Sequence, residues 1–119
     1  MGIKNVLVTL PSLGLIEPRK SDRHEYPLLI HINGRALNRV VIDQHYTEKH
    51  NESVNDQIII DLIKRLDGET FVVEAEQGDF QYFTAEPVFQ NDDPYRVIMV
   101  LCIHDDYLGV INVFRVDRS

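Results

Sequence analysis

The segment 43–50, Asp-Gln-His-Tyr-Thr-Glu-Lys-His, holds the side chains best suited to chemistry. His45 and His50 can give or take a proton near neutral pH, and Lys49 can stabilise a negative phosphate. Metal-independent RNA cleavage needs one group that takes the 2′-OH proton, one that protonates the leaving oxygen, and a cation at the phosphorane. The segment therefore predicts an acid–base site, although a solvated loop with local hydrogen bonds would use the same residue types.

Arg115, at the end of the last apolar run, is the fourth predicted site residue. Its guanidinium can hold a phosphate through two hydrogen bonds. The alternative is an ion pair with Glu74 or Glu76 on a neighbouring strand. Asn112 lies three residues earlier, so it would share a face with Arg115 only across a bulge.

The sequence predicts no metal and no cofactor. His45 and His50 are five residues apart, which is not the i, i+4 spacing that puts two ligands on one helix face. No phosphate-binding glycine loop, dinucleotide fingerprint or His-Glu-x-x-His motif supports the common nucleotide- or zinc-dependent functions.

The first half of the chain predicts strands around one tight turn. Residues 4–10 form an expected strand, and the polar stretch 17–25 an expected surface loop. Asn33-Gly34 between the apolar runs 28–32 and 39–43 favours a type I′ hairpin, because both residues tolerate positive φ.

The second half predicts one helix and four strands. Ser53 is the expected N-cap and Gly68 the expected stop of a helix, with Ile59, Leu62, Ile63 and Leu66 on a single stripe. The expected strands are 70–76, 80–89, 95–104 and 107–116, with a loop at 90–94. Pro87 predicts an edge position, and the fully apolar run 97–103 predicts a central strand.

These elements predict an α+β fold of order β-β-β-α-β-β-β-β. The expected architecture is a twisted antiparallel sheet with the helix packed on one face. The 119 residues suit a single domain, with an N-terminal strand and hairpin in 1–43 and the helix plus antiparallel sheet in 44–119.

Composition sets limits on partners and compartment. The net charge of −7 repels phosphate backbones on average, so RNA binding would need a local basic cleft, for which His31, Arg35, Arg39 and Arg96 are available. The lone Cys102 excludes an internal disulfide and fits a reducing compartment. We therefore expect a cytoplasmic protein with no membrane partner.

The run His45-Tyr46-Thr47-Glu48-Lys49-His50, the helix after it and the final Val110-Ile111-Asn112-Val113-Phe114-Arg115 resemble the barnase–EndoU–colicin–RelE superfamily. The resemblance covers roughly residues 40–116 and is nearest to the phage- and toxin-associated branch. It implies a small metal-independent endoribonuclease. His45 and His50 would then exchange protons, while Lys49 and Arg115 would stabilise the phosphate. The acidic balance departs from the basic character of that family.

Two other functions compete with the ribonuclease. One is an acidic interaction module, resembling an immunity protein or antitoxin, that would bind a basic protein partner through its many carboxylates. The other is a non-catalytic domain that forms a homodimer through an exposed strand edge. Convergence of the predicted site residues in one pocket would favour the enzyme.

Overall fold

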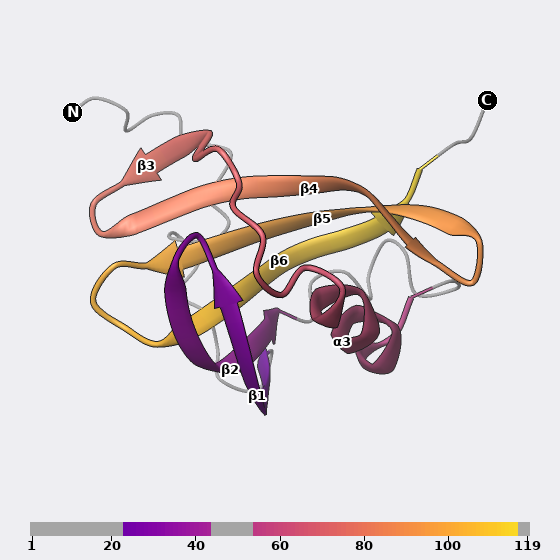
Figure 1. Ribbon diagram of the computed structural model, residues 1–119, viewed down its shortest axis with the longest axis horizontal. Coiled ribbons are helices and arrows are strands. Elements are labelled where there is room, and N and C mark those ends of the chain that lie inside the picture. The colour runs from indigo at the N-terminus through magenta and orange to yellow at the C-terminus, as the bar shows by residue number, and fades with distance from the viewer. Residues whose placement is uncertain (1–22, 44–53, 117–119) are drawn as a thin grey trace.

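The computed structural model of the chain describes residues 23–43 and 54–116, and the predicted strand 4–10 lies outside these ranges. The described elements form one mixed sheet with the strand order β1-β2-β6-β5-β4-β3, and one helix packs on it (Figure 1). The fold is therefore α+β. The elements are β1 (Arg23–Ile32), β2 (Arg35–Asp43), α3 (Asp56–Lys64), β3 (Ala75–Gln77), β4 (Phe80–Gln90), β5 (Asp93–Cys102) and β6 (Tyr107–Arg115).

The β1–β2 hairpin confirms the strongest local prediction. Asn33 and Gly34 both have positive φ, 52° and 75°, and the strands pair antiparallel. The expected loop at 17–25 is wrong in its last three residues, because Arg23–Glu25 open β1 and pair with β2. Charged side chains are compatible with this position, since β1 is an edge strand of the described sheet and all three residues are exposed.

The prediction of a wholly antiparallel sheet is wrong. β2 pairs with β6 in parallel, with Val41 opposite Gly109 and Ile42 opposite Val110. The chain leaves β2, passes through α3 and three strands, and returns beside β2 in the same direction. Local apolar patterns do not predict this parallel pairing, because it joins segments more than 60 residues apart.

The helix α3 begins two residues later than the sequence predicts. Asn55, not Ser53, is the N-cap, and its side-chain Oδ1 accepts a hydrogen bond from Ile58 N at 2.8 Å. The predicted stripe is confirmed, since Ile59, Leu62 and Ile63 are fully buried.

Backbone contacts set the path of the chain after the helix. α3 ends at Lys64 with Arg65 as its C-cap, four residues before the predicted stop. Gly68 ends the turn that follows, where it has a φ of 90° and donates its N–H to His31 O at 2.7 Å. The strand predicted at 70–76 shrinks to Ala75–Gln77, because Phe71 N instead donates to the Asn33 side chain.

The remaining strands follow the sequence closely. β5 lies between β6 and β4, as the apolar run 97–103 predicts. The prediction that β4 is an edge strand is wrong for the strand as a whole, since β4 lies between β5 and β3. Pro87 itself sits at a register shift, beyond the part of β4 that β3 covers. The loop predicted at 90–94 is instead a tight turn, because Asn91 and Asp92 both adopt positive φ.

The two faces of the sheet differ. The face toward α3 buries the core, in which Phe83, Met99 and Leu101 are at most 1% exposed. The opposite face, here called the open face, has no described helix upon it (Figure 1). No helix in the described ranges is long and apolar enough to cross a membrane.

Candidate functional site

Three of the four predicted catalytic residues, His45, Lys49 and His50, lie outside the described residues. Arg115 is described and half exposed, and its Nη1 lies 3.4 Å from Asp93 Oδ2 rather than beside Glu74 or Glu76. The structure therefore leaves the convergence of the four residues untested.

Asn112 does not join Arg115. In the β5–β6 ladder Asn112 is opposite Ile98 and Arg115 is opposite Tyr95, with regular pairing between the two positions. The side chains therefore point to opposite faces of the sheet. The bulge that the shared site required falls one residue earlier, at Ile111.

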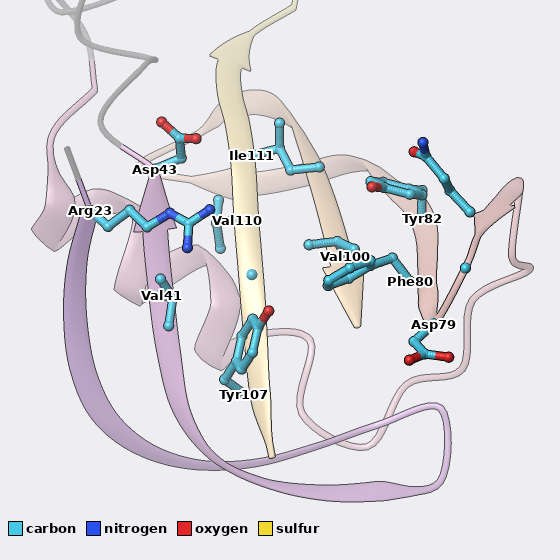
Figure 2. Close-up of a pocket in the computed structure, with 13 residues that line it drawn as sticks. Arg23, Val41, Asp43, Asp79, Phe80, Tyr82, Val100, Tyr107, Val110 and Ile111 are labelled. Carbon is cyan, nitrogen blue, oxygen red and sulfur yellow. The ribbon is translucent and has the colours of Figure 1, made fainter. Parts of the chain in front are cut away.

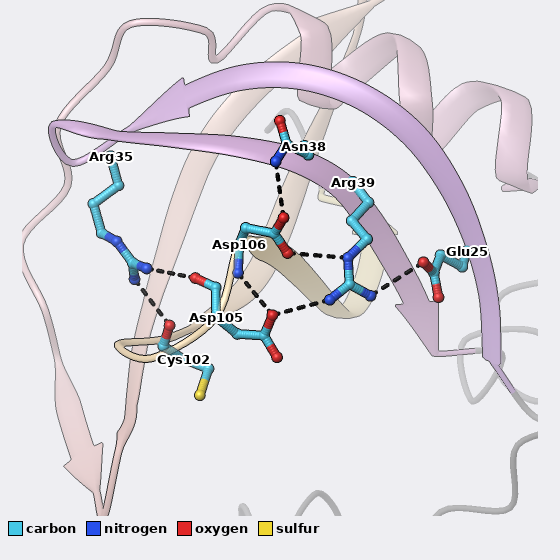
Figure 3. A network of polar contacts seen from close by, with 7 residues as sticks. All are labelled: Glu25, Arg35, Asn38, Arg39, Cys102, Asp105 and Asp106. Carbon is cyan, nitrogen blue, oxygen red and sulfur yellow. Dashed lines mark hydrogen bonds and ion pairs between the residues drawn. The ribbon is translucent and has the colours of Figure 1, made fainter.

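The cations that could have formed a basic cleft are engaged in polar contacts, and Figure 3 shows two of them, Arg35 and Arg39. Arg35 donates to the backbone oxygens of Cys102 and Asp105, and so holds the β1–β2 hairpin against the β5–β6 turn. Arg96 pairs with Glu86 at 2.6 Å.

Arg39 is the centre of this network (Figure 3). Its guanidinium contacts Glu25 at 3.1 Å, Asp105 at 2.9 Å and Asp106 at 3.1 Å, and it lies over the ring of Tyr107. A guanidinium shared by three carboxylates has little positive charge left to offer a phosphate.

The open face carries a pocket of about 430 Å³, which is within the usual size range of small-molecule sites (Figure 2). Its lining combines aromatic and aliphatic side chains from β2, β6, β5 and β4 with polar groups at both ends. The lining residues are Arg23, Val41, Asp43, Gln77, Gly78, Asp79, Phe80, Tyr82, Val100, Tyr107, Gly109, Val110 and Ile111.

Strand register explains how the middle of the pocket forms. Tyr82 is opposite Val100, Val100 is opposite Gly109, and Gly109 is opposite Val41, so these residues share one face across four strands. Gly109 has no side chain, and the Val100 side chain occupies the space where a Cβ would be.

Gly109 is also required by close packing. A Cβ at this position would lie 2.6 Å from Val100 Cγ1, well inside van der Waals contact. A larger residue would therefore displace Val100 within the pocket.

Two phenols give the pocket neutral hydrogen-bonding groups. Burial raises the pKa of the Tyr82 and Tyr107 hydroxyls above the usual 10, so both stay protonated at neutral pH. No hydrogen bond joins either hydroxyl to another described residue.

Gln77 provides the most informative polar atom. Its Oε1 is the one solvent-shielded side-chain oxygen or nitrogen in the described ranges that lacks a hydrogen-bond partner. An unsatisfied buried acceptor costs free energy, and such exceptions in a native fold call for an explanation. Because a water molecule does not reach this oxygen, a ligand in the pocket does not reach it either unless the Gln77 side chain moves.

A second cluster lies where β1 meets the start of α3. Asp56 Oδ2 lies 2.6 Å from His24 Nδ1 and accepts a hydrogen bond from the Tyr26 hydroxyl at 2.5 Å. The Asp56 hydrogen bond, with burial and the carboxylate charge, raises the pKa of Tyr26. Beside this cluster is a shallow pocket lined by Tyr26, Pro27, Leu28, Asp56, Gln57, Ile60 and Lys64.

Sequence reasoning missed both sites. It placed His24 in a surface loop, and none of its four predicted site residues is among the described residues that line the two pockets. Tyr82 is 5% exposed, but it is buried on the open face and not against α3. Only Gly109 inside an apolar run carried a usable signal, because a glycine within a strand marks a bulge or a close approach.

Within the described ranges, no three His, Cys, Asp or Glu side chains are grouped so that they could hold a metal ion. No protein-family model, curated protein or solved structure matches the chain.

Proposed function

We propose that the chain is a binding domain whose working site is the pocket on the open face. The observation that carries the proposal is a hollow of about 430 Å³ walled by aromatic and aliphatic side chains, with the Tyr82 and Tyr107 phenols among its lining. Mostly apolar concavities with a few directed polar groups are the usual form of a ligand site. The proposal needs no nucleophile and no metal.

A neutral apolar fluorophore, N-phenyl-1-naphthylamine, tests this function. We expect saturable enhancement of its emission by the full chain. Val41→Phe fills the pocket from β2 and should weaken binding by about fivefold or more, a loss on the order of 1 kcal/mol.

Val72→Phe is the matched control, because Val72 is 82% exposed and does not line the pocket. It should bind the fluorophore like the wild type. Equal affinity in Val41→Phe and wild type, or no saturable binding at all, would contradict the proposal.

The cluster of His24 and Asp56 favours a second candidate function, which is metal-independent RNA cleavage. A carboxylate hydrogen-bonded to one imidazole nitrogen orients the ring and leaves its other nitrogen available for proton transfer, as acid–base catalysis requires. Asp56 opens α3, soon after the segment that holds His45, Lys49 and His50. The roles of those three residues and of Arg115 remain predictions.

Cleavage of labelled RNA in excess EDTA tests this candidate. His24→Ala, His45→Ala and His50→Ala should each abolish cleavage while the fold stays intact. His104→Ala is the control, since His104 is 70% exposed and contacts only Asp79 among the described residues. If the wild-type protein cleaves none of the RNAs, the ribonuclease hypothesis is ruled out.

A further inference from the structure

Arg23 is the positive group among the described residues that line the pocket, and no other described residue takes its side-chain hydrogen bonds. Every other described arginine donates to an oxygen of the protein. These arginines are Arg35, Arg39, Arg65, Arg96 and Arg115. A guanidinium has five N–H donors, so Arg23 can give all of them to water or to a bound molecule.

The Arg23 side chain points into the pocket. Figure 2 shows it reaching from β1 past Val41 toward the middle of the pocket, where the hydroxyl ends of Tyr107 and Tyr82 also point. Burial, and then Cys102, raise the pKa of Tyr107, whereas the positive charge of Arg23 lowers it. Burial, and then Tyr107, raise the pKa of Tyr82. The guanidinium and the two phenols therefore lie within electrostatic reach of one another.

Both phenols are open to a ligand. Neither hydroxyl has a hydrogen-bond partner among the described residues, and neither is solvent-shielded as Gln77 Oε1 is. Water therefore reaches both hydroxyl oxygens, and a ligand in the pocket can reach them as well. Their raised pKa values keep both groups protonated at neutral pH, so each can donate its O–H. The middle of the pocket thus gathers hydrogen-bond donors.

Two carboxylates lie at the margins of the pocket and limit the charge of a ligand. Figure 2 shows Asp43 at the end of β2 and Asp79 beyond Phe80, near the turn that joins β3 to β4. Asp43 is opposite Arg23 in the β1–β2 register, so its charge offsets part of the guanidinium charge. These carboxylates and the net charge of −7 disfavour a doubly negative ligand, whereas one guanidinium matches one negative charge.

Apolar side chains surround the donors. Val41, Val110 and Val100 come from β2, β6 and β5, and Phe80 and Ile111 complete this surface. Such walls fit the apolar body of a ligand. They also exclude water, which strengthens the hydrogen bonds that a ligand makes with the guanidinium.

From these contacts we propose that the pocket binds a monocarboxylic acid, a single carboxylate attached to an apolar body. The carboxylate accepts hydrogen bonds from the Arg23 guanidinium and the Tyr107 hydroxyl, and the body packs on Val100 and Ile111. Arginine is suited to this role, because its planar fork can form two parallel hydrogen bonds with a carboxylate. This inference rests on the proposed binding function and names the ligand class of the same pocket.

Calorimetric titration with a series of related compounds tests the ligand class. At neutral pH, 3-phenylpropanoate is singly negative, 3-phenylpropanamide has the same shape without the charge, 2-phenylethyl phosphate is mostly doubly negative and 3-phenylpropylamine is positive. We expect the propanoate to bind tightest and the amide about tenfold more weakly, the usual effect of a hydrogen bond to a charged group. The phosphate ester and the amine should also bind more weakly than the propanoate.

The ratio of propanoate affinity to amide affinity reports the role of Arg23. Arg23→Gln should bring this ratio to about one, because the amide side chain has no charge to pair with the carboxylate. Asp43→Asn should raise the ratio, because it removes a like charge next to the site.

Arg65→Gln is the matched control. It removes the same charge from the exposed C-cap of α3, and Arg65 lines neither pocket. The ratio should stay close to that of the wild type. A fall as large as in Arg23→Gln would show that the effect comes from net charge, and it would overturn the assignment.

The outcomes separate the ligand class from the binding function. If N-phenyl-1-naphthylamine binds but the propanoate binds no tighter than the amide, the pocket is a ligand site and the acid assignment is wrong. Arg23→Gln with the wild-type ratio, or a phosphate ester that binds tightest, overturns the assignment in the same way. If neither the fluorophore nor any compound of the series binds, the binding function fails as well.

Discussion

Gly109 allows close packing in the wall of the pocket. It faces Val100 across the β5–β6 ladder, and the Val100 side chain occupies the space where a Cβ would be. Its role is steric, since a Cβ would lie 2.6 Å from Val100 Cγ1. The requirement is therefore for the absence of a side chain.

Gly109→Ala should destabilise the fold by about 1–3 kcal/mol, the usual cost of forcing extra atoms into a packed contact. Val100→Ala should also destabilise, because Val100 is 4% exposed. Urea denaturation of both single variants and the double variant measures their coupling. We expect the double variant to lose less unfolding free energy than the two single variants lose together, because Val100→Ala makes room for the new methyl group. Strictly additive losses would contradict the steric account.

Tyr26 makes stability depend on alkaline pH. Its hydroxyl donates to Asp56, which together with burial raises the pKa of the folded phenol above the unfolded value near 10. Because the pKa is raised in the folded state, the Tyr26 hydroxyl contributes its full share of the unfolding free energy below pH 10. This contribution is lost as the pH rises through the pKa of the folded phenol.

Tyr26→Phe removes the donor and should cost about 1 kcal/mol at neutral pH, as for a typical hydrogen bond. The difference in unfolding free energy between wild type and variant should shrink as pH rises above 10. The absorbance difference between the two proteins should show the Tyr26 phenol ionising later than a free tyrosine. A difference in unfolding free energy that stays constant into the alkaline range would contradict this role of the Tyr26 hydroxyl.

At the scale of elements, the β1–β2 hairpin is fixed to the β5–β6 turn by Arg39. The guanidinium contacts Glu25 on β1 and both acids of the turn, Asp105 and Asp106. The Asn38 amide, and then Arg39, hold the pKa of Asp106 below its usual range. This network stabilises the parallel β2–β6 contact, which sequence patterns did not indicate.

Arg39→Lys should destabilise the protein by about 1 kcal/mol more than Arg96→Lys, because a lysine cannot bridge three carboxylates at once. Arg96 is a matched control, with one carboxylate, Glu86, and one ring, Phe114. Urea denaturation at low and high salt measures both effects, and salt should narrow the difference. Equal losses in the two variants would show that Arg39 has no bridging role.

Sequence predicted the elements whose signals are local. Asn33-Gly34 specified its turn through backbone conformation, and the stripe Ile59, Leu62, Ile63 specified the buried face of α3. It missed the turn at Asn91-Asp92, where two non-glycine residues adopt positive φ. Non-glycine residues adopt positive φ less readily than glycine, so the sequence at this turn resembles an ordinary loop.

At the scale of the whole molecule, the chain has a net charge of −7, and several carboxylates in the described ranges are paired locally with cationic side chains. Asp93 faces Arg115, Glu86 faces Arg96, and Asp67 faces His31. The acidic interaction module, the basic protein partner and the homodimer therefore remain predictions. Sequence patterns did not indicate the pocket, because its walls come from strands that only non-local pairing brings together.

The most direct test of the central claim is methyl NMR of the full chain during titration with N-phenyl-1-naphthylamine. The binding account predicts shifts for Val41, Val100 and Ile111 on the open face, and none for Ile59 and Leu62 on the buried side of α3. Shifts confined to the α3 side, or no shift at saturating fluorophore, would contradict it.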